Sequence, residues 1–168
     1  MGSDLIYNQA TTLLVDVVDI FSDEGISLPD LRYIHSGEVA YDCDLVAVQV
    51  SRIRIGSPSR EQTQSVAKTM FETGVAYRIH VIRKLCAILQ DEGKFPTADQ
   101  FDQDALVVMQ DGWVLFNGLV TRANQGTLAA GVLCDEIVIG PAATTGPQGG
   151  LGGWTCEVVL APVDPLGS

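Results

Sequence analysis

Two histidines and four cysteines are the residues of this chain with the greatest capacity for catalysis or metal binding. The cysteines are Cys43, Cys86, Cys134 and Cys156. His35 and His80 lie in different parts of the chain, and the sequence contains no C-x-x-C pair. Zinc sites usually include at least one closely spaced pair of ligands, so this spacing predicts no metal site.

Each cysteine lies in an apolar, strand-like stretch of the sequence. This context favours buried free thiols in a reducing compartment over disulfides. A small cysteine-dependent enzyme remains a third choice of function. It would require the fold to bring one of these thiols against His35 or His80, where the imidazole would act as its base.

The carboxylates and glycines form no recognisable catalytic or binding motif. Asp135 and Glu136 open a predicted strand without the oxygen ligands at loop spacing that calcium requires. The glycine cluster at 149–153 lacks the Lys-Ser/Thr ending of a phosphate loop and precedes a strand, so it offers a phosphate no helix N-terminus. We therefore expect no catalytic, cofactor-binding or metal-binding residues, and a protein that is not an enzyme.

The composition is that of a folded, acidic protein. The chain has 168 residues, of which 46% are hydrophobic, and this apolar content excludes intrinsic disorder. Its length suits a single domain, 1–168. The net charge of -11 argues against tight binding of duplex DNA, because phosphate contacts need a positive patch. We also expect neither a transmembrane helix nor a signal peptide, because the apolar stretches are short and the N-terminus lacks a basic region.

Two helices are predicted, at 1–24 and 97–123. Gly25 is the stop signal of the first, and Thr97 with Gln100 fits a capping box at the start of the second. Asp16, Asp19 and Asp23 fall outside the apolar face of the first helix and form an acidic stripe. The stripe is either a solvated helix face or the lining of a passage. The predicted apolar face of the second helix consists of Phe101, Ala105, Val108, Met109, Phe116 and Val120.

Two long strands are predicted to pair as a protruding hairpin over 43–85. The apolar positions of the first strand change sides before Arg52 and Arg54, which indicates either a bulge or a strand that leaves its sheet. Shorter extended segments are expected at 28–35, 133–139 and 154–160. A glycine-rich loop at 140–153 and a proline-rich C-terminal arm at 161–168 complete the chain. The order predicts an α+β fold, a mixed or antiparallel sheet with two helices on one face.

Several segments, in order along most of the chain, resemble tail terminator proteins of bacteriophages with long non-contractile tails, of the type found in phages of actinobacteria. The segments that carry the resemblance are 31–37 (LRYIHSG), 42–45 (DCDL), 50–58 (VSRIRIGSP), 95–98 (FPTA) with the helix that follows, 139–141 (IGP) and 146–155 (GPQGGLGGWT). The resemblance implies a mixed sheet with helices on one side.

Proteins of this family form a hexameric ring on the last ring of tail-tube subunits, stop tube growth and present a surface to the head-side connector. The resemblance thus implies an assembly function, without catalysis or cofactor, in the tail-neck region of a virion assembled in the host cytoplasm. The implied partners are further copies of the chain, the tail tube (major tail) protein and the connector or head-closure protein. Genomic DNA would pass through the lumen, and no membrane is involved. Another head-tail joining protein, a head-closure or tail-completion subunit, is the alternative.

The residues supply candidate contacts for such a ring. Arg52, Arg54 and Arg60 of the hairpin arm would pair with acidic neighbours, which sets specificity and register more than affinity. Candidates from the glycine-rich loop and the strand after it are Gly149, Gly150 and Trp154. Six copies would carry six times -11, a net charge of -66, and negative walls repel DNA phosphates. Asp16, Asp19 and Asp23 are the candidates for lining the passage; a solvated surface is the alternative for all of these residues.

Overall fold

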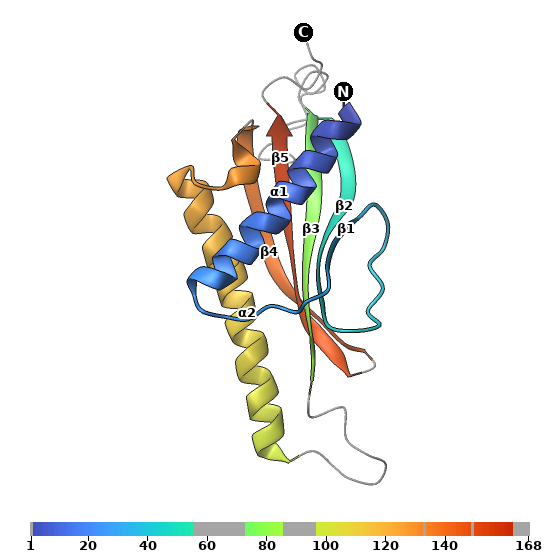
Figure 1. Cartoon of the computed structure of the whole chain (residues 1–168), viewed down its shortest axis with the longest axis vertical. Coiled ribbons are helices and arrows are strands. Elements are labelled where there is room, and N and C mark those ends of the chain that lie inside the picture. Colours follow the sequence, from blue (N-terminus) through green and yellow to red (C-terminus); the bar gives the residue numbers. More distant parts are fainter. Residues whose placement is uncertain (1, 56–72, 86–96, 133, 149, 163–168) are drawn as a thin grey trace.

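The computed structural model describes residues 2–55, 73–85, 97–132, 134–148 and 150–162 as two helices beside one five-stranded sheet (Figure 1). The helices are α1 (Gly2–Asp23) and α2 (Ala98–Gln125), with a short 3-10 helix, η2 (Ala129–Gly131), after α2. The strands are β1 (Arg32–His35), β2 (Leu45–Ile55), β3 (Thr73–Lys84), β4 (Cys134–Gln148) and β5 (Leu151–Pro162).

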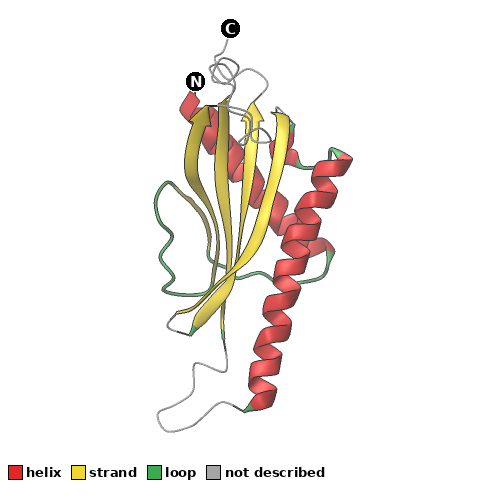
Figure 2. Cartoon of the chain, turned by 180° about the vertical axis from the view of Figure 1, so that it is seen from behind, coloured by secondary structure: helices red, strands yellow, loops and turns green. Residues whose placement is uncertain are grey.

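The strands lie in the spatial order β1-β2-β3-β5-β4. β1 runs parallel to β2, and the other neighbouring strands are antiparallel. Side chains from both helices and from one face of the sheet share one buried cluster, and the view from behind shows the other face of the sheet in front (Figure 2). The predicted α+β fold with a mixed sheet and two helices is therefore confirmed.

The larger core cluster fills the space between the helices and the sheet, where alternate residues of the strands point toward the helices. Leu13 and Phe21 of α1, Leu115 of α2, Ile79 of β3 and Val158 of β5 are fully buried in it. A second, smaller cluster lies on the opposite face, under the connection between β1 and β2, and consists of Leu45, Ala47, Ile82 and Leu151. The sheet thus has one face covered for the most part by helices and one face covered in part by a loop.

Both helices begin or end where the local sequence predicted. Thr97 and Gln100 exchange the two hydrogen bonds of a capping box at the start of α2. Gly25 follows α1 and Gly126 ends α2 with φ of 68° and 69°, a left-handed conformation that glycine adopts without steric cost.

The change of sides along β2 is caused by a bulge. The pairing of β2 with β3 shifts register between Val50 and Arg52, so one extra residue, Ser51, lies on β2. Beyond the bulge Arg52 extends over the face opposite the helices and pairs with Glu157 of β5. The tip of the predicted hairpin, with Arg60, lies outside the described residues, so its protrusion stays a prediction.

The predicted loop at 140–153 is wrong, because most of it belongs to the long antiparallel pair of β4 and β5. Proline is tolerated here since β4 is an edge strand and Pro141 lies within a register shift. Gly153 lies where β5 approaches β3 closely: a Cβ there would lie 1.9 Å from the carbonyl oxygen of Val81. The predicted C-terminal arm begins inside β5, and 163–168 lie outside the described residues.

Candidate functional site

The two halves of α2 have different surroundings. Toward its C-terminus Val114, Leu115 and Leu119 are buried against α1 and the sheet. Toward its N-terminus the helix continues past α1 and away from the sheet, as Figure 1 shows. There Phe101 is 52% exposed and Met109 is 67% exposed, although both were predicted on the buried face. The prediction is wrong for these two residues because the core reaches only the second half of the helix.

A stripe of large apolar side chains runs along the outward side of α2. Leu106, Met109 and Trp113 recur three and four positions apart, which places them on one face of the helix. Each is about two-thirds exposed, with 67%, 67% and 68% of its surface open. Large apolar side chains that cluster in this way on a surface usually mark an interaction site. We call these three residues the α2 stripe.

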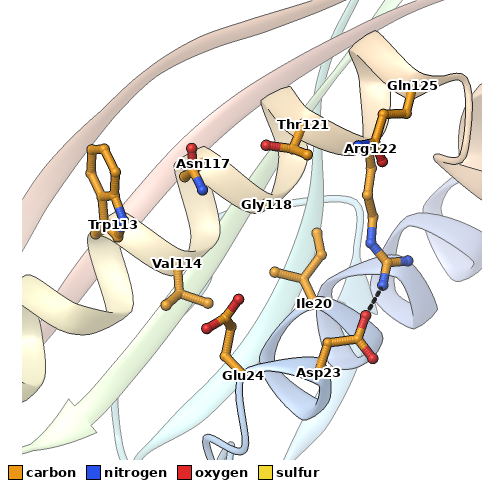
Figure 3. Close-up of a pocket in the computed structure, with 10 residues that line it drawn as sticks. All are labelled: Ile20, Asp23, Glu24, Trp113, Val114, Asn117, Gly118, Thr121, Arg122 and Gln125. Atoms are coloured by element: carbon orange, nitrogen blue, oxygen red, sulfur yellow. Dashed lines mark hydrogen bonds and ion pairs between the residues drawn. The ribbon is translucent and has the colours of Figure 1, made fainter.

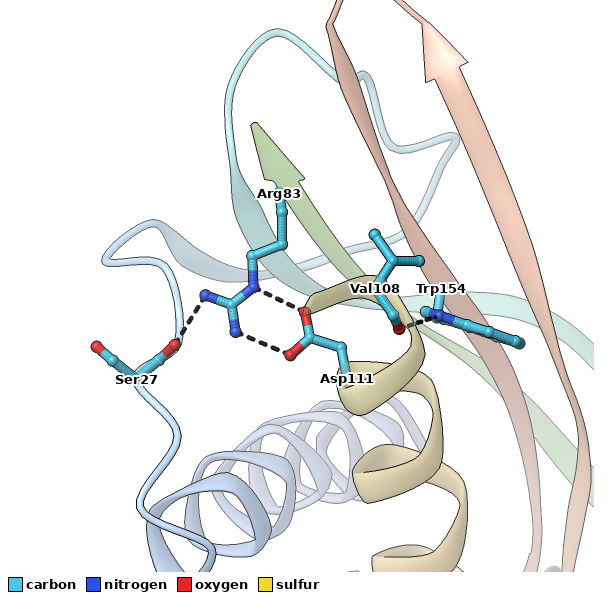
Figure 4. A network of polar contacts seen from close by, with 5 residues as sticks. All are labelled: Ser27, Arg83, Val108, Asp111 and Trp154. Atoms are coloured by element: carbon cyan, nitrogen blue, oxygen red, sulfur yellow. Dashed lines mark hydrogen bonds and ion pairs between the residues drawn. The ribbon is translucent and has the colours of Figure 1, made fainter. Parts of the chain in front are cut away.

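One side of the α2 stripe borders an open apolar groove. The groove is lined by Met109, Gly112, Trp113, Phe116, Pro141, Ala142 and Trp154. The indole nitrogen of Trp154 donates a hydrogen bond to the carbonyl oxygen of Val108, which fixes the ring against α2 (Figure 4). A Cβ at position 112 would lie 2.3 Å from the Trp154 ring, so only glycine permits this contact.

The other side of the stripe borders a polar hollow between the two helices, drawn in Figure 3. Asp23 of α1 accepts a hydrogen bond of 2.7 Å from Arg122 of α2, and this ion pair closes one end of the hollow. Glu24 is exposed at the hollow and has no ion-pair partner among the described residues. Trp113 lines both hollows and so forms the ridge between them, and Asp23 and Glu24 line the polar one.

A buried ion pair holds α2 in this position. Asp111 is 1% exposed and accepts two hydrogen bonds from Arg83 of β3, of 2.7 and 3.0 Å. The same guanidinium donates to the carbonyl oxygen of Ser27 at 2.8 Å, so one side chain links β3, α2 and the segment after α1 (Figure 4). Because a bidentate pair fixes both position and orientation, it determines how far α2 extends past the sheet.

The predicted interface residues are not brought together. Arg52 pairs with Glu157 at 2.8 Å on the face of the sheet away from the helices, whereas Trp154 lies on the helix side. Gly150 is buried at the β4–β5 turn, where its carbonyl oxygen accepts a hydrogen bond from Leu85. The side chain of Arg54 and all of Arg60 and Gly149 lie outside the described part of the chain. Of this group, only Trp154 reaches the α2 surface.

The predicted acidic stripe on α1 is wrong for Asp16. Asp16 is 2% exposed, and its carboxylate accepts hydrogen bonds from the backbone of Ala129 and Ala130 at 2.9 and 2.8 Å. Burial raises the pKa of this carboxyl, and these hydrogen bonds oppose that shift. Asp16 thus caps η2 and is not open to a passage, while Asp19 and Asp23 are both exposed.

The histidine on the far face of the sheet is held in a neutral, structural role. His80 is buried between the Tyr41 hydroxyl, 2.8 Å from Nδ1, and the Gln49 amide oxygen, 2.9 Å from Nε2. Burial, with a smaller contribution from Arg78, lowers the pKa of His80 to about 4. Neither histidine is hydrogen bonded to a cysteine in the described part of the chain, and burial raises the pKa of the Cys156 thiol to about 12.

Cys43, Cys134 and Cys156 are free thiols, as predicted, whereas Cys86 lies outside the described residues. Within the described ranges no three His, Cys, Asp or Glu side chains gather as metal ligands would. None of the described helices combines the length and apolar character that a membrane crossing needs. Scans against models of known protein families and against curated proteins find no match to this chain.

The α2 stripe was missed because the sequence was assigned a single apolar face. The signal was present: apolar residues fill 105–109 and 113–116 without a break, which is more than one face of a helix requires. Such a helix is either buried on several sides or contacts a second partner. The candidate functional site is therefore a contact surface, formed by the α2 stripe and the two hollows beside it.

Proposed function

We propose that this protein is a virion assembly subunit, a tail terminator that forms a hexameric ring at the head-side end of a phage tail tube. The observation that carries the proposal is the α2 stripe, because three large apolar side chains about two-thirds exposed in one subunit are the mark of a surface covered by a partner. The sequence resemblance to tail terminators and the α+β fold with helices on one side support the same function.

In this proposal the protein acts by binding and carries out no reaction. Its partners are further copies of itself, the tail tube protein and the head-side connector, with genomic DNA passing through the lumen. A net charge of -11 per copy suits such a passage, because negative walls repel phosphates. Asp19 and Asp23 stay candidates for the lining, and Asp16 does not.

The test is assembly of the pure protein. Light scattering and electron microscopy, with and without purified tail tubes, should show a six-fold ring, either free or on tube ends. The variant Trp113→Glu should weaken assembly at least tenfold, because it places a charge on the ridge of the contact surface. Asn124→Glu, an exposed change on the same helix, is the matched control and should assemble normally.

A wild-type protein that stays monomeric and never binds tubes would contradict the proposal. A ring located at the connector instead of the tube end would favour the alternative, a head-closure or tail-completion subunit. Thiol alkylation separates the third choice: loss of a measurable turnover on alkylation would indicate a cysteine-dependent enzyme.

A further inference from the structure

The molecule has two incompletely covered faces on opposite sides of one sheet. The first is the helix side, with the α2 stripe and its two hollows. The second is the back of the sheet, seen in front in Figure 2, where the segment between β1 and β2 covers only one part. A head-to-tail arrangement of copies would cover both faces with a single kind of contact. Such heterologous contacts form a ring when the rotation from copy to copy closes.

The central strands and the helices differ in charge. The central strands β2 and β3 contain Arg52, Arg54, Arg78, Arg83 and Lys84, and no acidic residue. The helices α1 and α2 contain eight acidic residues and one basic residue, Arg122. Part of this charge is neutralised inside the subunit, because Arg83 pairs with Asp111 and Arg122 pairs with Asp23. The charges that stay without a partner decide what each face can bind.

On the back of the sheet, two exposed side chains of β3 carry such a charge among the described residues: Lys84 at the end of the strand and, nearer its middle, Arg78. The side chain of Arg78 is exposed, and it forms no ion pair with a described residue. Its register neighbour on β5 is Glu157, which is engaged by Arg52 instead. Glu38 and Asp42 line the same hollow as Arg78 without pairing to it. Arg78 is thus an exposed cation at the edge of the segment that covers part of the sheet.

On the helix side the corresponding site is the ridge formed by Trp113. The ring is open to solvent, and the unpaired carboxylate of Glu24 lines the same interhelical hollow. A guanidinium over an indole ring gains a cation–π interaction, and a carboxylate beside it adds a charge-assisted hydrogen bond. Trp113 and Glu24 are therefore a suitable receptor for one arginine side chain.

We propose that the back of the sheet of a second copy covers the α2 stripe and its two hollows. Arg78 of that copy then lies on Trp113 and against Glu24. This inference rests on the proposed function, because it identifies which two faces meet in the ring. Each subunit gives Arg78 to one neighbour and receives an Arg78 from the other.

Charge exchange tests this pairing. Glu24→Arg and Arg78→Glu should each weaken ring formation at least tenfold, because each places like charges against one another. The double variant, Glu24→Arg with Arg78→Glu in one chain, should recover most of the assembly. Circular dichroism and thermal unfolding check that each variant is folded, and Asn124→Glu is again the control for a change of surface charge.

Mixing the two single variants gives a sharper result. The helix side of a Glu24→Arg copy fits the sheet of an Arg78→Glu copy. The two remaining faces carry the wild-type pair, Arg78 on the first copy and Glu24 on the second, so they attract as well. A head-to-tail contact therefore predicts that the mixture recovers assemblies of alternating copies, although neither variant assembles alone. Sedimentation measures this at concentrations where the wild type assembles, with tail tubes present if the wild type needs them. A mixture that assembles no better than either variant alone would overturn the pairing.

A photo-crosslinking residue at Met109 gives a readout that does not depend on charge. With a mixture of copies labelled with light and heavy nitrogen, crosslinks should join α2 of one copy to β2, β3 or the 36–44 segment of another. Crosslinks from α2 to α2 would overturn the inference in favour of a two-fold contact, and crosslinks to the tube protein would assign the surface to that partner.

The two proposals fail in different ways. If wild-type rings form and all three charge variants assemble like the wild type, the pairing of faces is wrong and the ring function stands. If the wild type neither forms a ring nor binds tubes, the proposed function is wrong, and the pairing of faces fails with it.

Discussion

The two halves of α2 have a similar apolar content and opposite environments. Leu115 in the second half is fully buried, whereas Leu106 in the first half is 67% exposed. The second half lies over the sheet and beside α1, and the first half extends past both (Figure 1). A single helix thus serves as core at one end and as surface at the other. The apolar residues at the exposed end contribute little to the folding of one subunit, so we attribute them to assembly.

The largest expected difference is between the stabilities of the Leu115 and Leu106 variants. Leu115→Ala should lower the free energy of unfolding by about 2–5 kcal/mol, because it removes buried methyl groups and leaves a cavity. Leu106→Ala should change it by less than about 0.5 kcal/mol. Denaturant unfolding of the monomer measures both. Equal losses would show that the exposed half of α2 is packed in solution, and would end the contrast between the two halves.

Asp111 and Asp102 provide a second comparison along α2. Asp111→Ala should cost about 3 kcal/mol, because it leaves the Arg83 guanidinium poorly exposed and without its carboxylate. The same change at Asp102, on the exposed half, should be nearly neutral, since surface charges contribute about 0–1 kcal/mol. Urea unfolding at low and high salt separates them, because screening affects the buried pair less. A neutral Asp111→Ala would mean that another contact positions α2.

Acid unfolding extends the comparison to the back of the sheet. His80 has a pKa of about 4 in the fold against 6.5 when unfolded. Between these pH values the unfolded chain therefore holds a proton on this imidazole that the folded chain does not. Its contribution to stability is present above pH 6.5 and is lost as the pH falls toward 4, by about 2 kcal/mol between pH 7 and 5. Leu106→Ala should follow the wild-type pH dependence, whereas His80→Gln should flatten it. A wild-type curve as flat as that of His80→Gln would show that His80 is solvated.

The smallest effect is expected at the boundary between the two halves. Gly112→Ala would gain helix propensity in an open helix, but here the new Cβ would overlap the Trp154 ring. The clash should prevail and cost about 1–2 kcal/mol. Replacing Trp154 by leucine in the same chain should reduce that cost, and a double-mutant cycle measures the difference. Additive changes would show that the ring does not press on the helix.

Local rules gave much of the architecture from the sequence alone. Thr97 and Gln100 mark the start of α2, Gly25 marks the end of α1, and the change of sides along β2 is a bulge. These features depend on a few neighbouring residues, and the physics that produces them acts within a turn or a strand pair. The same is true of the two helices and the mixed sheet, which follow from apolar periodicity.

The incorrect predictions share one cause: whether a residue is buried depends on partners that are distant in the sequence. The sequence at 140–153 is rich in glycine and proline, and it becomes strand only because β5 provides an antiparallel partner and the bulges absorb the prolines. Asp16 has the helical position of a surface residue, and η2, far along the chain, converts it into a buried cap.

The α2 surface shows the same division. Composition and periodicity determined that residues 98–125 form an apolar helix, because helix formation is local. Which half of that helix is covered was decided by the tertiary structure, since the length of α1 and the position of the Arg83–Asp111 pair fix where the core ends. Likewise the sequence determined a net charge of -11, and only the fold separated a helix layer rich in carboxylates from a strand pair rich in arginine.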